Sequence, residues 1–147
     1  RYVHDVLGYN YRLTDLQAAI GCAQLEQWDW LVARRRVLAL FYQRHLPSSV
    51  HMQDDPDDGV HGRWAMAVLL PDGAQPGAVA DRLGREGIET RPFFTPLHRA
   101  PMYQACARHP CTVADDLVAR GLVLPLHGQM TEAHVRRVCS ALAEAMA

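Results

Sequence analysis

Apolar residues recur at helical spacing along the first third of the chain. Residues 13–46 contain no proline and one glycine, Gly21, and their apolar side chains return at steps of three, four or seven. Thr14 followed by Gln17 has the form of a capping box, which predicts a helix beginning there. The pattern predicts one long helix, or two helices in series. Its apolar positions are Leu16, Ile20, Ala23, Trp30, Val37 and Phe41.

Gly21 is out of place in this helical pattern. A glycine inside a helix costs about 1 kcal/mol relative to alanine. We therefore expect another backbone to approach the helix closely at this position.

Beyond residue 62, short apolar runs alternate with turn signals. Pro71-Asp72-Gly73 is typical of a turn, and Gly87 is typical of a helix end. Thr131 begins a second capping signature. The pattern predicts strands over residues 64–70, 88–94 and 122–124, and helical segments over 76–87, 102–107, 113–119 and 131–147. Strands interleaved with helices indicate a small α/β layer packed beside a long helix.

The segment between these two parts, residues 52–62, is strongly acidic. It holds Asp54, Asp55, Asp57 and Asp58 together with a proline and glycines, a composition that solvates well and packs poorly. A calcium loop would need a bidentate glutamate after the aspartates, and none follows. We predict an exposed loop.

Charge and composition narrow the classes of partner. Fifteen basic residues stand against sixteen acidic ones, so no global field would attract nucleic acid or a membrane surface. All the basic residues are arginines, and the chain has no lysine. The four cysteines show no C-x-x-C spacing, and no apolar run approaches the length of about 18 residues that spans a bilayer. These features predict a soluble, cytoplasmic protein with reduced thiols.

Several kinds of site can be set aside. The eight histidines include no H-x-x-x-H or H-E-x-x-H arrangement, so we expect no metal site. None of the three serines lies in a G-x-S-x-G elbow, which excludes that form of hydrolase site. Arg34, Arg35 and Arg36 point in different directions on a helix, and exposed helix surface is the favoured interpretation.

Two segments, 8–12 and 87–98, combine aromatic residues with isolated polar groups. Such mixtures suit a site for a flat or polar ligand, although turn and strand packing gives the same pattern more often. At these segments, GYNYRLTDLQAAIGCAQLEQ and GIETRPFFTPLHRAPMY, the sequence resembles the DegT/DnrJ/StrS family of sugar aminotransferases, in its perosamine-synthetase-like branch. The resemblance is strong over residues 7–46 and 63–103, and moderate over 113–147.

This resemblance implies a domain organisation. Family members have the type I aminotransferase fold, in which a large domain that binds pyridoxal 5'-phosphate precedes a small C-terminal α/β domain. Residues 1–46 would form the end of the large domain, an interface loop and the long connecting helix. Residues 47–62 would form the exposed acidic loop, and residues 63–147 the small domain. We therefore expect an upstream segment to be missing before Arg1.

The resemblance also implies site residues. Asn10 would reach across a homodimer, whose active sites are shared between subunits, to the cofactor phosphate of the partner, and its NH₂ group is suited to donate there. Arg91 and His98 would face the nucleotide sugar, with Phe93 and Phe94 as an apolar wall. Each has a plainer alternative: a turn-capping asparagine, an arginine paired with a carboxylate, and a histidine satisfying an internal hydrogen bond.

The implied reaction moves an amino group from an amino acid, such as glutamate, to a nucleotide-linked keto-deoxysugar. The family's lysine, which holds the cofactor and moves the proton, is absent here, so we assign no catalytic residue and expect this chain alone to be inactive. Two alternatives remain open. Relatives with histidine in place of that lysine dehydrate the sugar, and a non-catalytic interaction domain or remnant would leave the apolar faces between Leu16 and Phe41 uncovered.

Overall fold

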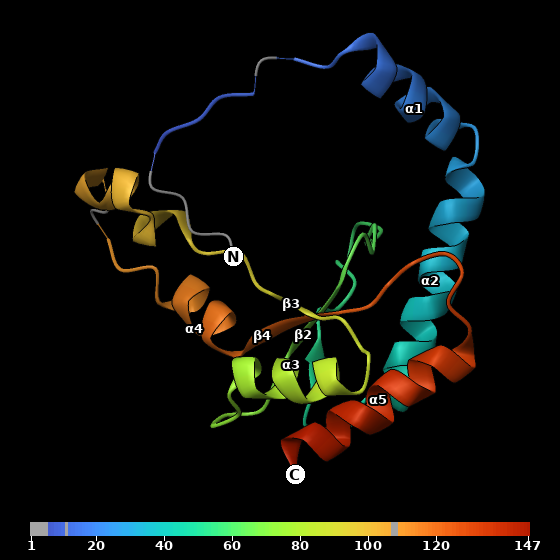
Figure 1. The fold of residues 1–147 in the computed structure, drawn as a ribbon, viewed down its shortest axis with the longest axis vertical. Coiled ribbons are helices and arrows are strands. Elements are labelled where there is room, and N and C mark those ends of the chain that lie inside the picture. The colour runs from blue at the N-terminus through green and yellow to red at the C-terminus, as the bar shows by residue number, and fades with distance from the viewer. Residues whose placement is uncertain (1–5, 11, 107–108) are drawn as a thin grey trace.

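The computed structural model describes residues 6–10, 12–106 and 109–147, which form a small sheet, helices packed on it and an extended helical arm (Figure 1). The strands are β1 (His51–Met52), β2 (Met66–Leu69), β3 (Arg91–Pro92) and β4 (Gly121–Leu124). The α-helices are α1 (Asp15–Leu25), α2 (Trp28–His45), α3 (Pro76–Arg85), α4 (Thr112–Arg120) and α5 (Glu132–Met146). Two 3-10 helices, η1 (Leu97–Arg99) and η2 (Pro101–Cys106), precede α4. The fold is thus mixed helix and sheet, as predicted.

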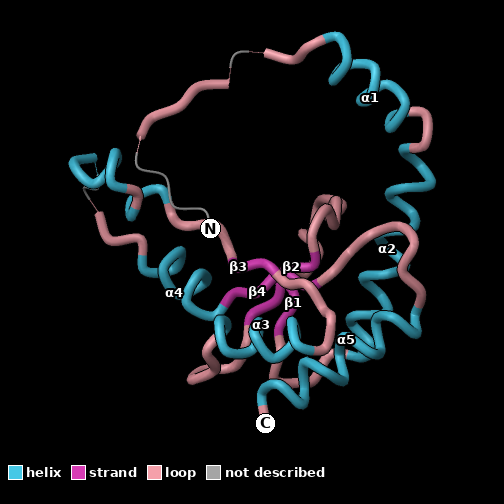
Figure 2. Tube along the Cα trace, in the orientation of Figure 1, coloured by secondary structure: helices cyan, strands magenta, loops and turns pink. Residues whose placement is uncertain are grey.

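The sheet has the strand order β1-β2-β4-β3, and all neighbouring strands are antiparallel. Met66 of β2 lies opposite Leu124 of β4, and Leu69 lies opposite Gly121. Because side chains alternate between the faces of a strand, Met66 and Val68 point to the same side, and both are buried. Their face of the sheet packs against α2, α3 and α5 (Figure 2).

The core lies between this sheet face and the three helices. Leu38 and Tyr42 of α2, Leu83 of α3 and Leu142 of α5 have no exposed surface. The Tyr42 hydroxyl donates a hydrogen bond of 2.7 Å to the Pro125 carbonyl oxygen. Burial, followed by the neighbouring Cys139, raises the pKa of Tyr42 far above its usual value, so the phenol stays protonated.

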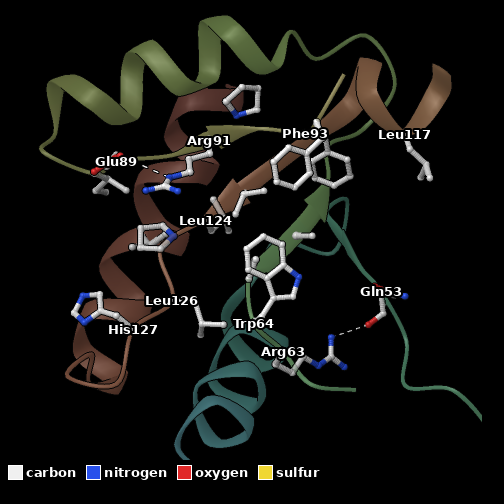
Figure 3. A pocket seen from close by; sticks show the side chains of 18 of the residues that line it. Gln53, Arg63, Trp64, Glu89, Arg91, Phe93, Leu117, Leu124, Leu126 and His127 are labelled. Carbon is white, nitrogen blue, oxygen red and sulfur yellow. Dashed lines mark hydrogen bonds and ion pairs between the residues drawn. The ribbon is translucent and has the colours of Figure 1, made fainter. Parts of the chain in front are cut away.

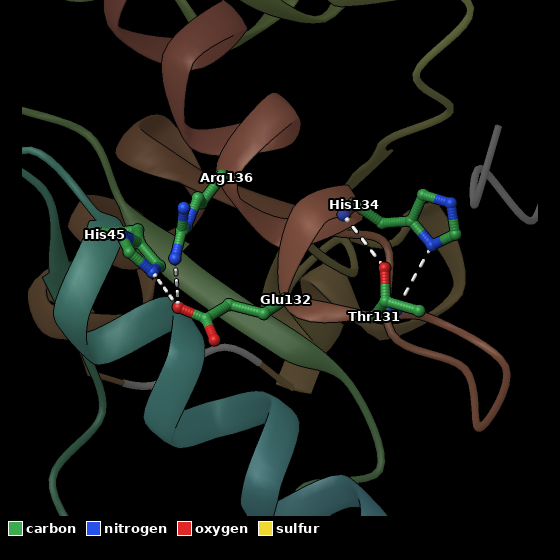
Figure 4. Close-up of polar contacts among 5 residues, drawn as sticks. All are labelled: His45, Thr131, Glu132, His134 and Arg136. Carbon is green, nitrogen blue, oxygen red and sulfur yellow. Dashed lines mark hydrogen bonds and ion pairs between the residues drawn. The ribbon is translucent and has the colours of Figure 1, made fainter.

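A polar cluster joins α2 to the start of α5 (Figure 4). Glu132 Oε1 lies 2.9 Å from His45 Nε2 and 2.9 Å from an Arg136 guanidinium nitrogen. These hydrogen bonds, first to His45 and then to Arg136, lower the pKa of Glu132. Thr131 and His134 form the capping box predicted at the beginning of this helix.

The predicted first helix is two helices in series, one of the two alternatives. Thr14 and Gln17 form the predicted capping box of α1, and the chain turns at Glu26 and Gln27 before α2 begins. The expectation for Gly21 does not hold among residues 6–10, 12–106 and 109–147, because a Cβ placed there would meet no atom of these residues within 4 Å. The arm lies away from the sheet, which leaves Gly21 far from the other described elements (Figure 1).

The later elements follow the prediction with shifted boundaries. The predicted strand over residues 88–94 is paired only at Arg91 and Pro92, because proline has no N–H to extend the ladder. Strand β1 was not predicted, since two residues carry no detectable alternation. Gly87 has a φ of 72°, which confirms its place at the end of α3. Residues 53–60 are exposed, which confirms the acidic loop.

None of the helices in the part of the chain that the structure describes combines the length and apolarity that a membrane crossing requires.

Candidate functional site

A cleft of about 1250 Å³ lies beside the sheet, between its strands and the helices α4 and α5 (Figure 3). Ala67 of β2 and Val123 of β4 lie opposite each other in the register and form part of its floor. They alternate along their strands with buried residues that belong to the core on the other face. The walls come from the segment before β2, from β3 and the residues on either side of it, from α4, from the loop between β4 and α5, and from α5 itself. A concave apolar site with a few polar groups is typical of ligand binding.

Two of the residues predicted for substrate binding, Arg91 and Phe93, line this cleft together. Arg91 is exposed, and its Nε lies 3.9 Å from a Glu89 carboxylate oxygen, which is beyond hydrogen-bond length. Phe93 is half-buried against Gly121, where a Cβ would lie 2.4 Å from the phenyl ring. Glycine at this position of β4 therefore makes room for the Phe93 ring.

Sequence reasoning missed Trp64, which stands at the centre of the lining residues in Figure 3. Its indole stacks with the ring of Phe94, with centroids 6.3 Å apart and planes 12° from parallel. The position of Trp64 immediately before a short apolar strand was a usable signal, but the residue was counted as part of the strand. Phe94 lines the cleft as well, and its role as an apolar wall for the nucleotide sugar stays a prediction.

The structure holds the residue before Trp64 firmly. Arg63 has a φ of 45°, a left-handed conformation that costs free energy in a residue with a side chain. Its guanidinium lies 2.6 Å from Asp55 and donates to the Gln53 carbonyl oxygen at 2.9 Å, while its backbone N–H donates to His61 Nδ1. These contacts fasten the acidic loop to the edge of the cleft.

His98 does not line the cleft. Its Nε2 lies 2.9 Å from Asp115 Oδ1, which Arg99 Nε also approaches to 2.6 Å. The three side chains tie η1 to α4, which is the internal hydrogen bond considered as the alternative for this histidine. A contact between His98 and a substrate remains a prediction.

Asn10 also lies outside the cleft lining, in the exposed segment before α1. Its side-chain oxygen accepts a 3.3 Å hydrogen bond from the backbone N–H of Arg12. That bond does not use the NH₂ group, which is the part of the amide suited to donate to a phosphate oxygen. The donor chemistry therefore fits a phosphate. The sequence offers no lysine amine to accompany it.

The prediction that Arg34 belongs to exposed helix surface was wrong. Its Nε donates to the Gly128 carbonyl oxygen at 3.0 Å, and a second guanidinium nitrogen donates to the Met130 carbonyl oxygen. The correction has a simple cause: Arg34 faces the loop before α5, whereas Arg36 faces solvent. Residues 6–10, 12–106 and 109–147 contain no group of three or more His, Cys, Asp or Glu side chains placed to hold a metal ion.

Comparison with known proteins gives relatives along nearly the whole chain. The chain is 37% identical to the GDP-perosamine synthase of Escherichia coli O157:H7 over 145 residues, which cover 98% of this chain and 39% of the relative. It is 38% identical to the GDP-perosamine synthase of Caulobacter vibrioides over 148 residues, covering 97% and 40% respectively. The chain thus spans about two fifths of the length of these curated relatives.

Solved structures share the fold of this chain. A DegT/DnrJ/EryC1/StrS aminotransferase from Brucella abortus superposes with a TM-score of 0.80 at 22% identity, over 99% of this chain and 39% of that one. The model of the DegT/DnrJ/EryC1/StrS aminotransferase family matches residues 1–143. The chain therefore belongs to the DegT/DnrJ/EryC1/StrS aminotransferase family.

Proposed function

We propose that the complete protein transfers an amino group from an amino acid, glutamate in the first instance, to a nucleotide-linked keto-deoxysugar. The observation that carries this proposal is the family match over residues 1–143, and two further relatives, from Saccharopolyspora spinosa and Acidithiobacillus ferrooxidans, are named as aminotransferases of nucleotide-linked sugars. The cleft supports it because an apolar hollow with arginines at its rim suits a ligand that joins uncharged rings to a diphosphate.

Arg91 is proposed to bind the diphosphate. Its guanidinium is exposed within the cleft, and a planar fork of donors matches phosphate oxygens in a way that a single ammonium does not. The contact with Glu89 leaves both side chains more than half exposed, so it competes weakly with a doubly charged ligand. Phe93 would form the wall that keeps water from one side of the sugar.

Asn10 is proposed to donate to the phosphate of pyridoxal 5'-phosphate in the partner subunit of a homodimer. Bound there, the cofactor would carry the amino group between the two substrates. Within this sequence, Asn10 is the one residue assigned to that group, and the lysine of the reaction would come from residues outside these 147. We also propose the domain division of the family for this chain, with boundaries at residues 1–46, 47–62 and 63–147. We propose a cytoplasmic location as well.

The coding sequence in frame before Arg1 provides the first test. A lysine in a cofactor-binding context is expected, and histidine in its place would favour the dehydratase instead. The complete encoded protein, incubated with glutamate and GDP-, dTDP- or UDP-linked keto-deoxysugars, should yield an amino sugar and an equal amount of 2-oxoglutarate. A sugar that loses water while no 2-oxoglutarate appears would contradict aminotransfer, and no reaction with any of these sugars would favour the interaction domain.

Two variants test the assignment of the cleft. Arg91→Gln should raise the KM for the nucleotide sugar at least tenfold, because the lost charge contacts the diphosphate. Arg85→Gln is the matched control, since Arg85 is an exposed arginine of α3 that does not line the cleft. Equal KM values for the two variants would remove Arg91 from the site.

A further inference from the structure

The cleft presents two large aromatic side chains to solvent instead of burying them. Trp64 is 67% exposed and Phe94 is 60% exposed, although both belong to the wall of an apolar hollow. Their rings are nearly parallel, and the pair leaves open aromatic surface at the cleft. An exposed, ordered aromatic surface next to a cleft is suited to stack a flat ligand.

The backbone around this pair fixes its position before any ligand arrives. Arg63 adopts its left-handed conformation while its guanidinium is held by Asp55 and the Gln53 carbonyl oxygen. Met66, two residues after Trp64, is buried in the core. Trp64 therefore stands between two anchored points, and little conformational entropy remains to be lost on binding.

The charges around the cleft indicate what the flat ligand carries. Arg63, Arg91 and Arg137 line it, and Glu89 is the acidic residue among the lining side chains. Arg63 is already paired with Asp55, and Arg137 donates to the Glu86 carbonyl oxygen. Of the polar contacts named for the three arginines, that of Arg91 is the longest, because its Nε lies 3.9 Å from a Glu89 carboxylate oxygen. The combination suits a planar ring attached to an anionic group.

We infer that Trp64, together with Phe94, is the stacking surface for the base of the nucleotide, and that the cleft takes purine nucleotides in preference to pyrimidine nucleotides. The inference rests on the proposed function, because it assumes that a nucleotide occupies the cleft. A purine has the larger ring system and covers more of an indole face than a pyrimidine does. Trp64 thereby sets base specificity, while Arg91 binds the phosphates of either nucleotide.

The test titrates the full 147-residue chain with GDP and with CDP, two probes that share ribose and diphosphate and differ in the base. The unchanged chain should bind GDP more tightly. Trp64→Ala should weaken GDP binding roughly 5- to 100-fold and bring the two affinities together. Trp64→Phe keeps an aromatic ring, so it should weaken GDP binding less than Trp64→Ala does.

Trp28→Ala is the matched control, because Trp28 is 58% exposed at the beginning of α2 and does not line the cleft. It should leave both affinities unchanged. Arg91→Gln should weaken the binding of GDP and the binding of CDP by the same factor. If Trp64→Ala binds both nucleotides as the unchanged chain does while Arg91→Gln binds neither well, the stacking role is overturned and the proposed use of the cleft stands. If the unchanged chain binds neither nucleotide, the inference about the base is overturned, and the proposed function is decided separately by the 2-oxoglutarate assay on the complete protein.

Discussion

The helical arm and the body of this protein both carry apolar side chains at helical spacing, with opposite results. In α1 and the first half of α2, apolar side chains such as Leu16, Ile20 and Trp30 are more than half exposed. In the second half of α2 and in α5, Leu38 and Leu142 are completely buried. Figure 1 shows the reason, because α1 extends away from the sheet while α2 ends against α5.

This difference teaches what a periodic pattern measures. Helical spacing of apolar residues shows that a helix has an apolar face, but it does not show what covers that face. The positions predicted as the apolar stripe of α2 included Trp30 and Val37, whereas the core contains Leu38 and Tyr42.

Shortening a core leucine should have the largest effect on stability. Leu142→Ala should lower the free energy of unfolding by about 2–5 kcal/mol, because the side chain is fully buried and a cavity remains. Ile20→Ala on the arm is the matched change and should stay within about 0.5 kcal/mol. Urea denaturation measures both. Comparable losses for the two variants would show that the arm is packed in solution.

The buried hydroxyl of Tyr42 offers a smaller effect within the body. Tyr42→Phe should cost about 1 kcal/mol, because it removes the hydrogen bond to the Pro125 carbonyl oxygen and leaves that oxygen without this donor. Tyr103→Phe, at a more exposed position of η2, is the control and should change little. If Tyr42→Phe leaves the free energy of unfolding unchanged, a water molecule takes the place of the hydroxyl as donor.

Arg34 marks the border between the two regions, so its loss should act locally. Its bonds to the Gly128 and Met130 carbonyl oxygens hold the middle of α2 to the body. Arg34→Ala should speed amide hydrogen exchange in the first half of α2 by roughly tenfold while the exchange of α5 stays the same. Arg36→Ala is the control on the exposed side of the helix. A uniform rise along the whole chain would contradict a local role.

The smallest effect is expected from the pH dependence of the Glu132 cluster. His45 and Arg136 lower the pKa of the Glu132 carboxyl group. The ionised carboxylate therefore stabilises the fold at pH values above the ordinary carboxyl pKa. This contribution should fade as the pH falls through the lowered pKa. Melting temperatures of the unchanged chain and of Glu132→Gln should therefore differ at neutral pH and converge in acid. A constant difference across that range would exclude the ion pairs as its source.

Much of the fold could be predicted because local signals act within a few residues. Both capping boxes, the turn at Gly73 and the end of α3 at Gly87 depend on neighbours in sequence. The pairing of β1, the anchoring of Arg34 and the place of His98 depend on residues far along the chain, which no local pattern contains.

The candidate site was predicted in part. Arg91 and Phe93 do share the cleft, and the resemblance singled them out because they belong to a continuous motif. Trp64 was missed because its segment reaches the cleft only through pairing of β2 with β4. Asn10 lies on the arm, far along the chain from the cleft, so its predicted role needs the partner subunit that the proposed function supplies.

The contrast between arm and body can be measured most directly by amide hydrogen exchange on the 147-residue chain. A helix of eleven residues without tertiary packing is marginally stable, so the amides of α1 should exchange close to the rate of an unfolded peptide. Those of α5 and of the second half of α2 should be protected to the limit set by global unfolding. Protection of α1 equal to that of α5 would contradict the account, because it would mean that the apolar face of the arm is covered.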